Sequence, residues 1–328
     1  MGVLFFFFIS FIFFATNLHN LPTEKLKRKI ILLFGPTASG KSRIAIDIAK
    51  KYGGEILNAD SMQVYKEIKI LSARPDKSEI KHHFYGFISA KNTFSVGKWC
   101  KLVAKKIKEI QKKNKTPIVV GGTGLYFRAL IEGLVKIPKV KKLDYSHLNP
   151  IGRWMMGNHY HKKNPTIFEG INRNDIQRVS RAISVYEGTG LTLKEWQNKE
   201  NKKYFNSSDF IKLCLLPPKD DLEKKINSRF IQMLKKGALD EVRKYNKKFF
   251  VPASHISANS IIGIYEIGLY LQKSITLKNL KDRVLIRTRQ YAKRQYTWQR
   301  GQMQDWKQFT DTNYLDLRKK ILSYLSKT

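Results

Sequence analysis

A glycine-rich segment near the start of the chain constrains the fold more than any other feature. It consists of Gly35, Pro36, Thr37, Ala38, Ser39, Gly40, Lys41 and Ser42, and it satisfies the pattern G-x-x-x-x-G-K-[ST]. An apolar run typical of a buried strand precedes it at 29–35, and a helical pattern follows at 42–52. Such a loop turns backbone N–H groups inward around a phosphate, and the helix N-terminus adds partial positive charge. We therefore predict a diphosphate or triphosphate site, with a charge from Lys41 and an Mg²⁺ ligand from Ser42.

Further strand and helix patterns alternate with this segment. The run EILNAD ends at Asp60, and TPIVVGG at 116–122 again stops at glycines. Between them, residues 95–113 predict a lysine-rich helix that buries Val96, Trp99, Val103 and Ile107. Strands alternating with helices indicate an α/β fold: a P-loop NTPase-like parallel sheet flanked by helices, with ligands at the carboxyl ends of the strands.

The pattern changes after Pro138. Residues 139–170 show no clear periodicity, and 151–165 do not have the pattern of a regular helix. Helical periodicity returns at 174–190, 220–237, 257–271 and 280–301. We therefore predict a first part of the P-loop core at 29–138, a mainly helical insertion that binds RNA at 139–205, and completion of the core with basic helices at 206–328.

The charge balance predicts a polyanionic partner. The chain has 62 Lys and Arg against 26 Asp and Glu, a formal net charge of +36. Self-repulsion on this scale opposes compaction unless a partner screens it, so nucleic acid is favoured over an anionic membrane surface. Part of the lysine excess is also expected from the base composition of a genome. The two cysteines, Cys100 and Cys214, exclude a disulfide scaffold and a cysteine-type zinc site, which favours a reducing compartment.

Residues 1–28 form a separate leader. Its apolar run at 3–15 would span about 20 Å as a helix, short of the roughly 30 Å hydrocarbon core of a bilayer. No Lys or Arg precedes the run, contrary to the pattern of a signal peptide. A mispredicted start, a weak membrane anchor and a signal all remain open, and we expect membrane contact only if the leader is real.

A second chemical signal is Asp60. Kinases and hydrolases with a P-loop place an acidic residue at the end of a buried strand to help hold the metal. Here the strand at 117–120 ends in Gly121, Gly122, Thr123 and Gly124, without a carboxylate. Asp60 follows another strand and could act as a general base on a nucleophile brought to the phosphates. A helix N-cap is the alternative reading.

Six ordered segments make the chain resemble the bacterial tRNA dimethylallyltransferases, the isopentenyl-tRNA transferase family. They are GPTASGKS (35–42), DSMQVYK (60–66), VGGTGLYFRALIEGL (120–134), NDIQRVSRAISVYEGTG (174–190), RFIQMLKKGALDEV (229–242) and RQYAKRQYTWQRG (289–301). The resemblance implies transfer of a dimethylallyl group from dimethylallyl diphosphate to N6 of adenosine 37, beside the tRNA anticodon. It also implies Mg²⁺ as cofactor.

The resemblance carries roles onto individual residues. It implies that Asp60 takes the N6 proton, that Thr123 lies near the bridging oxygen, and that Lys41 with the glycine-rich loop holds the diphosphate. Ser61, Met62 and Gln63 would hold the flipped base. The tRNA anticodon stem-loop would also contact Gln177, Arg178, Val179, Ser180 and Arg181. We expect a cytoplasmic monomer without a protein partner.

Helical spacing alone places Gln177, Arg178 and Arg181 on one face, although a merely solvated charged face has the same pattern. In the late helix we assign the cations Arg283, Arg287, Arg289, Lys293, Arg294 and Arg300 to RNA or diphosphate, and the rings of Tyr291, Tyr296 and Trp298 to packing. Arg229 faces the active site or pairs with an acid, and both roles are open. The adjacent residues His82 and His83 would point to opposite sides of a strand, so we do not expect a metal site there.

The chain departs from the family pattern at three places. Residues 70–75 read ILSARP where the family usually has IGTAKP, which should alter a tight turn. Ile264 stands where the family usually has Tyr. The irregular segment at 139–170 occupies the place of a helical insertion that grips the anticodon stem, which bears on the hold on tRNA rather than on the donor chemistry.

Three other functions remain open at this point. An adenylate isopentenyltransferase would prenylate a free nucleotide. A small-molecule kinase would use the same P-loop on ATP, although Gly121 to Gly124 stand where its metal-binding acid is expected. A catalytically inactive RNA-binding or membrane-attached protein would explain the altered insertion and the leader.

Overall fold

The computed structural model describes residues 24–76, 78–249 and 257–328. The chain divides into two compact units, of which one comprises 132–204 and the other the remaining residues. Of the leader expected at 1–28, residues 1–23 lie outside the described part of the chain. Within the described ranges, no helix is long and apolar enough to cross a bilayer.

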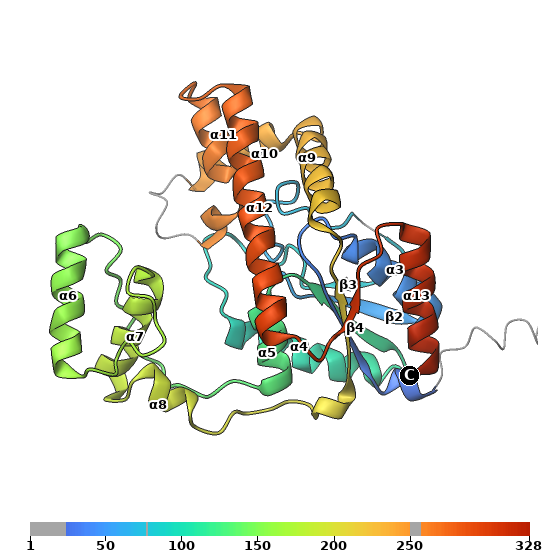
Figure 1. Ribbon diagram of the computed structural model, residues 1–328, viewed down its shortest axis with the longest axis horizontal. Helices are drawn as coiled ribbons and strands as arrows, with labels where there is room; N and C mark the ends of the chain where they lie inside the picture. Colours follow the sequence, from blue (N-terminus) through green and yellow to red (C-terminus); the bar gives the residue numbers. More distant parts are fainter. Residues whose placement is uncertain (1–23, 77, 250–256) are drawn as a thin grey trace, which may run out of the picture. The chain divides into compact units, whose positions relative to one another are not determined.

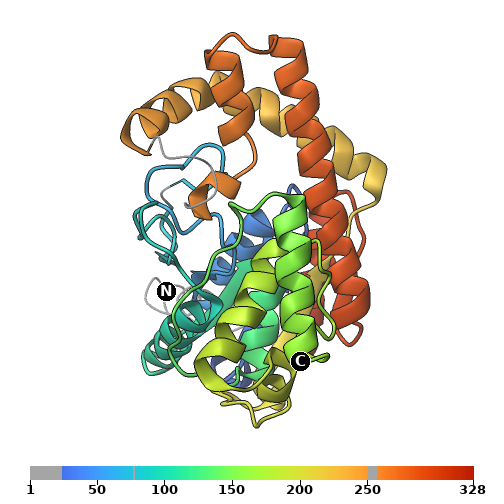
Figure 2. The same cartoon turned by 90° about the vertical axis from the view of Figure 1, so that its left-hand side faces the viewer.

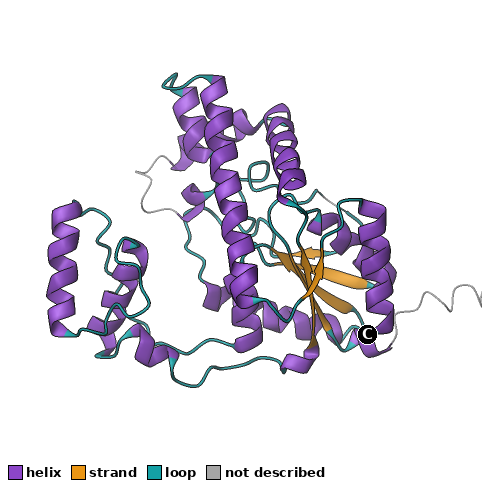
Figure 3. Ribbon diagram, in the orientation of Figure 1, coloured by secondary structure: helices purple, strands orange, loops and turns teal. Residues whose placement is uncertain are grey.

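The larger unit is built on one parallel sheet of six strands, drawn in orange in Figure 3. The strand order is β3-β2-β4-β1-β5-β6. The strands are β1 (Ile30–Phe34), β2 (Gly54–Asn58), β3 (His82–His83), β4 (Thr116–Gly121), β5 (Phe210–Leu215) and β6 (Lys307–Phe309). The parallel sheet predicted from the sequence is confirmed, and β3, β5 and β6 extend it.

Alternating side chains of the central strands bury both faces of the sheet. Ile31 and Leu33 of β1 belong to one apolar cluster with Ile44 and Ile48 of α3 (Lys41–Tyr52) and with Ile321 of α13 (Tyr314–Lys327). On the opposite face, Phe34 makes edge contacts with Phe127 of α5 (Gly124–Glu132) and with Trp306. Helix α4 (Val96–Gln111) buries Trp99, Val103 and Ile107, as predicted, whereas Val96, also predicted to be buried, is only half-buried at the start of the helix. A sheet covered on both faces explains why its strands read as unbroken apolar runs.

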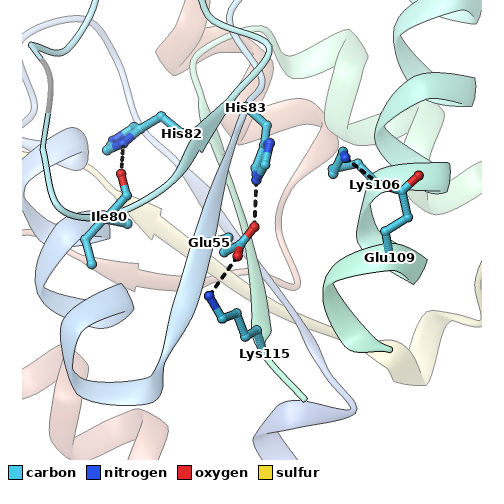
Figure 4. Close-up of polar contacts among 7 residues, drawn as sticks. All are labelled: Glu55, Ile80, His82, His83, Lys106, Glu109 and Lys115. Atoms are coloured by element: carbon cyan, nitrogen blue, oxygen red, sulfur yellow. Dashed lines mark hydrogen bonds and ion pairs between the residues drawn. The ribbon is translucent and has the colours of Figure 1, made fainter. Parts of the chain in front are cut away.

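A buried carboxylate ties the short strand β3 to β2 (Figure 4). Glu55 of β2 accepts hydrogen bonds from Lys115 Nζ at 2.9 Å and shares one with His83 Nε2 at 2.7 Å. His82 Nδ1 instead lies 2.8 Å from the carbonyl oxygen of Ile80. The two histidines therefore have structural partners on opposite sides of β3.

Four helices form a second layer of the larger unit (Figures 1 and 2). They are α9 (Lys219–Lys235), α10 (Ala238–Phe249), α11 (Ile264–Leu271) and α12 (Leu277–Gln302), and they contact one another in pairs. Their shared core includes Phe230, Val242, Ile267 and Val284. A short helix, α2 (Glu24–Lys27), precedes β1, and 3₁₀ turns lie at Ser207–Asp209 and Ser257–Ser260.

The smaller unit is helical, and one of its helices corrects the sequence analysis. It contains α6 (Pro150–Lys163), α7 (Ile176–Thr189) and α8 (Leu193–Gln197). The absence of a regular helix predicted for 151–165 is wrong. Asn149 caps α6 by accepting from the backbone N–H of Gly152, and Pro150 occupies the first turn. No residue of α6 is fully buried, so no apolar periodicity marks the helix.

The sheet brings three predicted site segments to one edge. The P-loop follows β1, Asp60 follows β2 and Thr123 follows β4, and these three strands are neighbours in the order β2-β4-β1. Because the strands are parallel, their carboxyl ends share one edge, where ligands bind in open α/β sheets.

Candidate active site

The P-loop makes a tight turn between β1 and α3. Gly40 has φ 85° and Ala38 has φ 63°, so the backbone passes twice through the left-handed region before α3 begins at Lys41. A glycine adopts this conformation freely, whereas Ala38 is strained there. The turn aims the first N–H groups of α3 toward the carboxyl edge of the sheet, which is the arrangement that binds phosphate.

Lys41 is the half-buried cation of this loop. Its Nζ donates to the carbonyl oxygen of Pro36 at 3.1 Å. Burial lowers the pKa of Lys41 to about 8, with Asp60 raising it and Arg229 lowering it further. The three charged groups therefore lie within electrostatic reach of one another, two cations facing one carboxylate. An anion entering between the cations would raise the pKa of Lys41 and keep it charged.

Arg229 of α9 is the second cation beside the P-loop. Its Nη1 donates to Thr37 Oγ1 at 3.0 Å. Burial lowers the pKa of its guanidinium, and Asp60 raises it. Of the two roles that the sequence left open for Arg229, the structure supports the position beside the P-loop.

Asp60 is held in a rigid turn. The buried carboxamide of Asn58 accepts from the Asp60 N–H at 2.8 Å and donates to the Asp60 carbonyl oxygen at 2.9 Å. Asp60 Oδ1 accepts from the Met62 N–H at 2.9 Å. This bond caps a turn, because residues 61–64 do not form a helix. The alternative of a helix N-cap is therefore not what the structure shows.

Thr123 is joined to the same turn. Its N–H donates to the Ala59 carbonyl oxygen at 3.2 Å, and its Oγ1 accepts from the Ser61 N–H at 3.0 Å. Burial raises the pKa of Tyr291 on α12, as does Asp60, while a hydrogen bond with Thr123 lowers it. The packing role assigned to the Tyr291 ring is therefore incomplete, because its hydroxyl belongs to this polar network.

Lys41, Asp60 and Arg229 line a cavity of about 380 Å³, whereas Thr123 is not among its lining residues. The predicted residues that line it include Thr37, Lys41, Asp60, Met62 and Gln63. The rest of the wall is mixed: its apolar residues include Leu71, Ile226, Phe230, Met233, Ile261 and Val284, and its polar residues include Ser72, Ser260, Thr288 and Gln290. The cavity thus offers both charged groups that suit a phosphate and apolar side chains that suit an apolar group.

The late helix contributes cations to this wall. Arg287 and Arg294 line the cavity, and Arg287 also pairs with the buried carboxylate of Glu266. Arg289 lies elsewhere on α12 and pairs with Glu223 at 3.4 Å. The remaining P-loop residue with a predicted metal role, Ser42, is exposed at the start of α3.

The departure at residues 70–75 forms part of the cavity wall. Glu241 of α10 accepts from the backbone N–H groups of Lys69, Ile70 and Leu71 at 2.7, 2.7 and 3.0 Å. The Gln63 side chain donates to the carbonyl oxygens of Ser72 and Ala73 at 2.9 and 3.0 Å. Leu71 is buried, and a Cβ on Gly263 would lie 2.9 Å from its Cδ2. The hydrogen bonds to Glu241 of α10 and the absence of a side chain at Gly263 therefore accommodate this turn.

The predicted RNA-facing residues lie on α7 in the smaller unit. Gln177, Arg178 and Arg181 are exposed. Val179 and Ser180 are buried, and Ser180 Oγ accepts from the Tyr145 N–H at 3.3 Å. We therefore assign these two side chains to the packing of α7 and keep the exposed ones as candidates for RNA contact.

Sequence reasoning missed Gln295 and Glu241. Gln295 of α12 accepts from the Thr37 N–H at 2.9 Å and donates to the Gly122 carbonyl oxygen at 2.8 Å. Both residues contact backbone groups far away in the sequence, so no local pattern marks them. The available signal is that both residues lie within segments that carry the family resemblance, Glu241 in 229–242 and Gln295 in 289–301.

Comparisons with known proteins identify the family of this chain. The sequence model of the family described as IPP transferase matches residues 63–302. A tRNA dimethylallyltransferase of Pelagibacter ubique is 47% identical over 285 residues, covering 85% of this chain and 90% of the relative. A tRNA dimethylallyltransferase of Parvibaculum lavamentivorans is 39% identical over 307 residues, covering 90% and 96%.

Solved structures show the same fold. A tRNA isopentenylpyrophosphate transferase of Bacillus halodurans has a TM-score of 0.65 at 27% identity, covering 92% of this chain and 97% of its own. A eukaryotic dimethylallyltransferase acting on tRNA has a TM-score of 0.69 at 29% identity, covering 83% and 69%. With its P-loop, its parallel sheet and these relatives, the chain belongs to the IPP transferase family.

Proposed function

We propose that the protein transfers a dimethylallyl group from dimethylallyl diphosphate to N6 of adenosine 37 in tRNA. The observation that carries the proposal is the single cavity in which Lys41 and Arg229 face Asp60. Gly121, at the end of β4, stands where a nucleotide-hydrolysing P-loop protein would place its metal-binding acid. The cavity thus combines an anion cradle with a base, as prenyl transfer to an amine requires.

The cradle would receive the leaving group. As the bond between the allylic carbon and oxygen breaks, its electron pair passes to the diphosphate. Backbone N–H groups of the P-loop, Lys41 and Arg229 would stabilise this growing charge, and Thr123 would lie near the bridging oxygen. Donors fixed in advance in a partly buried site stabilise such charge more strongly than water does.

Asp60 would act on the acceptor. The lone pair of N6 is delocalised into the adenine ring, so the amine is a poor nucleophile. As the new bond from N6 to carbon forms, the N6 proton would pass to the Asp60 carboxylate. Met62 and Gln63 line the same cavity and would hold the base, which must leave its stack to enter.

The residues present fit a divalent cation of the Mg²⁺ type. Mg²⁺ is commonly bound by one or two protein oxygens together with substrate phosphates and water. The Ser42 hydroxyl, beside Lys41, and Asp60 at the cavity are suitable oxygens. Bound there with the diphosphate, Mg²⁺ would neutralise charge on the leaving group.

A tRNA acceptor is favoured over a free nucleotide. The net charge of +36 and the exposed side chains of Gln177, Arg178 and Arg181 suit an extended polyanion rather than a mononucleotide. We place the anticodon stem-loop on this face of α7 and expect the enzyme to act as a cytoplasmic monomer.

Transfer of label tests the proposal. Purified protein is incubated with dimethylallyl diphosphate labelled in the prenyl group and with unmodified tRNA, and the digested tRNA is resolved into nucleosides. We expect label in N6-(dimethylallyl)adenosine. Label in AMP in preference to tRNA would instead establish a free-nucleotide enzyme, phosphate transfer from ATP would establish a kinase, and tRNA binding without transfer would establish an inactive RNA-binding protein.

A further inference from the structure

Gln295 is a buried carboxamide that joins the P-loop to the turn at 122–124. Only 4% of its surface is exposed. Its Oε1 accepts from the Thr37 N–H at 2.9 Å, and its Nε2 donates to the Gly122 carbonyl oxygen at 2.8 Å. Thr37 belongs to the P-loop, whereas Gly122 directly precedes Thr123. Since the carboxamide bonds to the backbone of both loops, Gln295 acts on the loops and not on a substrate.

The carboxamide lies where two strands separate. Phe34 of β1 pairs with Gly121 of β4, and the Gly35 N–H donates to the Gly121 carbonyl oxygen at 3.3 Å. Beyond that bond, the described residues show no backbone hydrogen bond between the P-loop and the turn at 122–124. At this point the side chain of Gln295 supplies one N–H donor and one C=O acceptor. Its carboxamide thus takes the place of a backbone amide and links the two segments where the strands have separated.

The turn is shaped to receive α12. A Cβ on Gly122 would lie 2.1 Å from Nε2 of Gln295, and a Cβ on Gly124 would lie 2.1 Å from Nε1 of Trp298. Tyr291, Gln295 and Trp298 follow one another at spacings of four and three, so they share a face of α12. The absence of a side chain at Gly122 and Gly124 therefore permits the close contact with this helix.

We propose that Gln295 is a positioning residue that fixes the separation between the P-loop and Thr123. The inference rests on the proposed function, because it assumes that both loops grip one diphosphate. Loss of the bridge would let the loops move apart by a fraction of an ångström to an ångström, and misplacement of this size is costly in catalysis. The proposal assigns the effect to donor binding and chemistry, not to the grip on tRNA.

Gln295→Met tests this, because it removes both hydrogen bonds at nearly constant side-chain length. We expect the Kd for pyrophosphate to rise about tenfold and the single-turnover rate to fall about 10- to 100-fold, since both loops lose their fixed geometry. The Kd for tRNA should stay within about threefold, because the bridge lies outside the RNA-facing helix.

Gln299→Met is the matched control. Gln299 lies one turn further along α12, is 3% exposed, and donates only to the Met303 carbonyl oxygen at 3.5 Å. Its variant replaces a buried carboxamide on the same helix in the same way, and its pyrophosphate affinity and turnover should stay within about twofold of the parent. Equal kinetic losses in both variants, or an unchanged pyrophosphate Kd in Gln295→Met, would overturn the proposal.

A second pair of variants keeps the proposal testable if Gln295→Met does not fold. Gln295→Glu keeps the side-chain size and the acceptor for the Thr37 N–H but has no proton for the Gly122 carbonyl oxygen near neutral pH. It is compared with Gln299→Glu in the same measurements and should show the same selective loss. Because pyrophosphate binding is measured without transfer, a wild-type protein that binds pyrophosphate but does not prenylate tRNA would contradict the proposed function alone.

Discussion

At the scale of single residues, the charge of Lys41 sets the response of the site to pH. Its pKa is lowered to about 8 by burial. Above this pH, the free enzyme loses a positive charge that faces the diphosphate. We therefore expect kcat/KM for dimethylallyl diphosphate to fall by about tenfold per pH unit on the alkaline side. A pH profile of initial rates, measured at saturating tRNA, checks this.

Lys41→Arg is the control for that profile. A guanidinium keeps its charge well above the pH range of the assay, so the alkaline fall should disappear even if the variant is slower. An alkaline fall that persists unchanged in Lys41→Arg would assign the titration to a different group.

The residues of the site differ in how readily a sequence reveals them. Lys41, Asp60 and Thr123 stand in contiguous motifs that follow strands, and the structure places Lys41 and Asp60 on one cavity. Gln295 and Glu241 act through backbone groups of distant segments, so only the folded chain identifies them. Tyr291 was assigned to packing alone because an aromatic residue at helical spacing looks the same whether its hydroxyl is used or not.

At the scale of elements, Glu241 attaches α10 to the cavity wall. Its carboxylate accepts from three successive backbone N–H groups, which include that of the cavity residue Leu71. In Glu241→Gln the charge is lost, and we expect unfolding free energy to fall by about 1–3 kcal/mol. We also expect kcat/KM for tRNA to fall roughly tenfold as the wall loosens. Urea denaturation and steady-state kinetics measure the two effects.

The neighbouring Asp240→Asn provides the comparison. Asp240 is exposed and pairs only with Arg243 on the same helix, so its loss should change stability by less than about 1 kcal/mol. If the two variants lose kcat/KM equally, the cause is the loss of negative charge on α10 in general and not the loss of the hydrogen bonds between Glu241 and the turn.

Glu55 gives β2 and β3 a pH-dependent link. Burial raises its pKa, but hydrogen bonds from Lys115 and His83 and their charges outweigh this, so the pKa lies below the ordinary 4.5. Its contribution to stability is therefore complete above pH 4.5 and is lost as pH falls through the folded pKa. Glu55→Gln should cost about 1–3 kcal/mol of unfolding free energy at neutral pH, and the difference should shrink in acid.

Denaturation of both proteins across this pH range measures the difference. Glu109→Gln is the matched surface change, because Glu109 pairs with Lys106 on the outside of α4, and it should change the unfolding free energy much less than Glu55→Gln does. A Glu55→Gln difference that is constant with pH would exclude the carboxylate charge as its source.

The elements that the sequence predicted are those with a buried face. The strands β1, β2 and β4 carry uninterrupted apolar runs, and α4 buries residues at helical spacing. Helix α6 buries none of its residues, so its sequence lacks the pattern that reveals a helix, and only its cap at Asn149 marks it. The two-residue strand β3 is too short for any periodicity.

At the scale of the whole molecule, positive charge makes RNA binding sensitive to salt. Arg181 is exposed on α7 and is proposed to contact the anticodon stem-loop. Arg181→Ala should weaken tRNA binding and reduce the log–log salt slope by about 0.7–0.9 for each lost phosphate contact. Fluorescence anisotropy with labelled tRNA at several salt concentrations measures both quantities.

Lys319→Ala removes one positive charge from the exposed side of α13 and serves as the comparison. It should leave the salt slope close to that of the parent, because a charge outside the interface releases no counterion. If Arg181→Ala also leaves the slope unchanged, Arg181 lies outside the interface.

The role of Asp60 tests the central claim most directly. The measurement is the single-turnover rate of prenyl transfer in Asp60→Asn, with tRNA and dimethylallyl diphosphate both saturating. We expect the rate to fall by about 10²- to 10⁴-fold, as for loss of a general base, while the Kd for tRNA stays within about threefold. Transfer at nearly the parental rate, or lost tRNA binding with intact transfer at saturation, would contradict the assignment of Asp60 as the base opposite the diphosphate cradle.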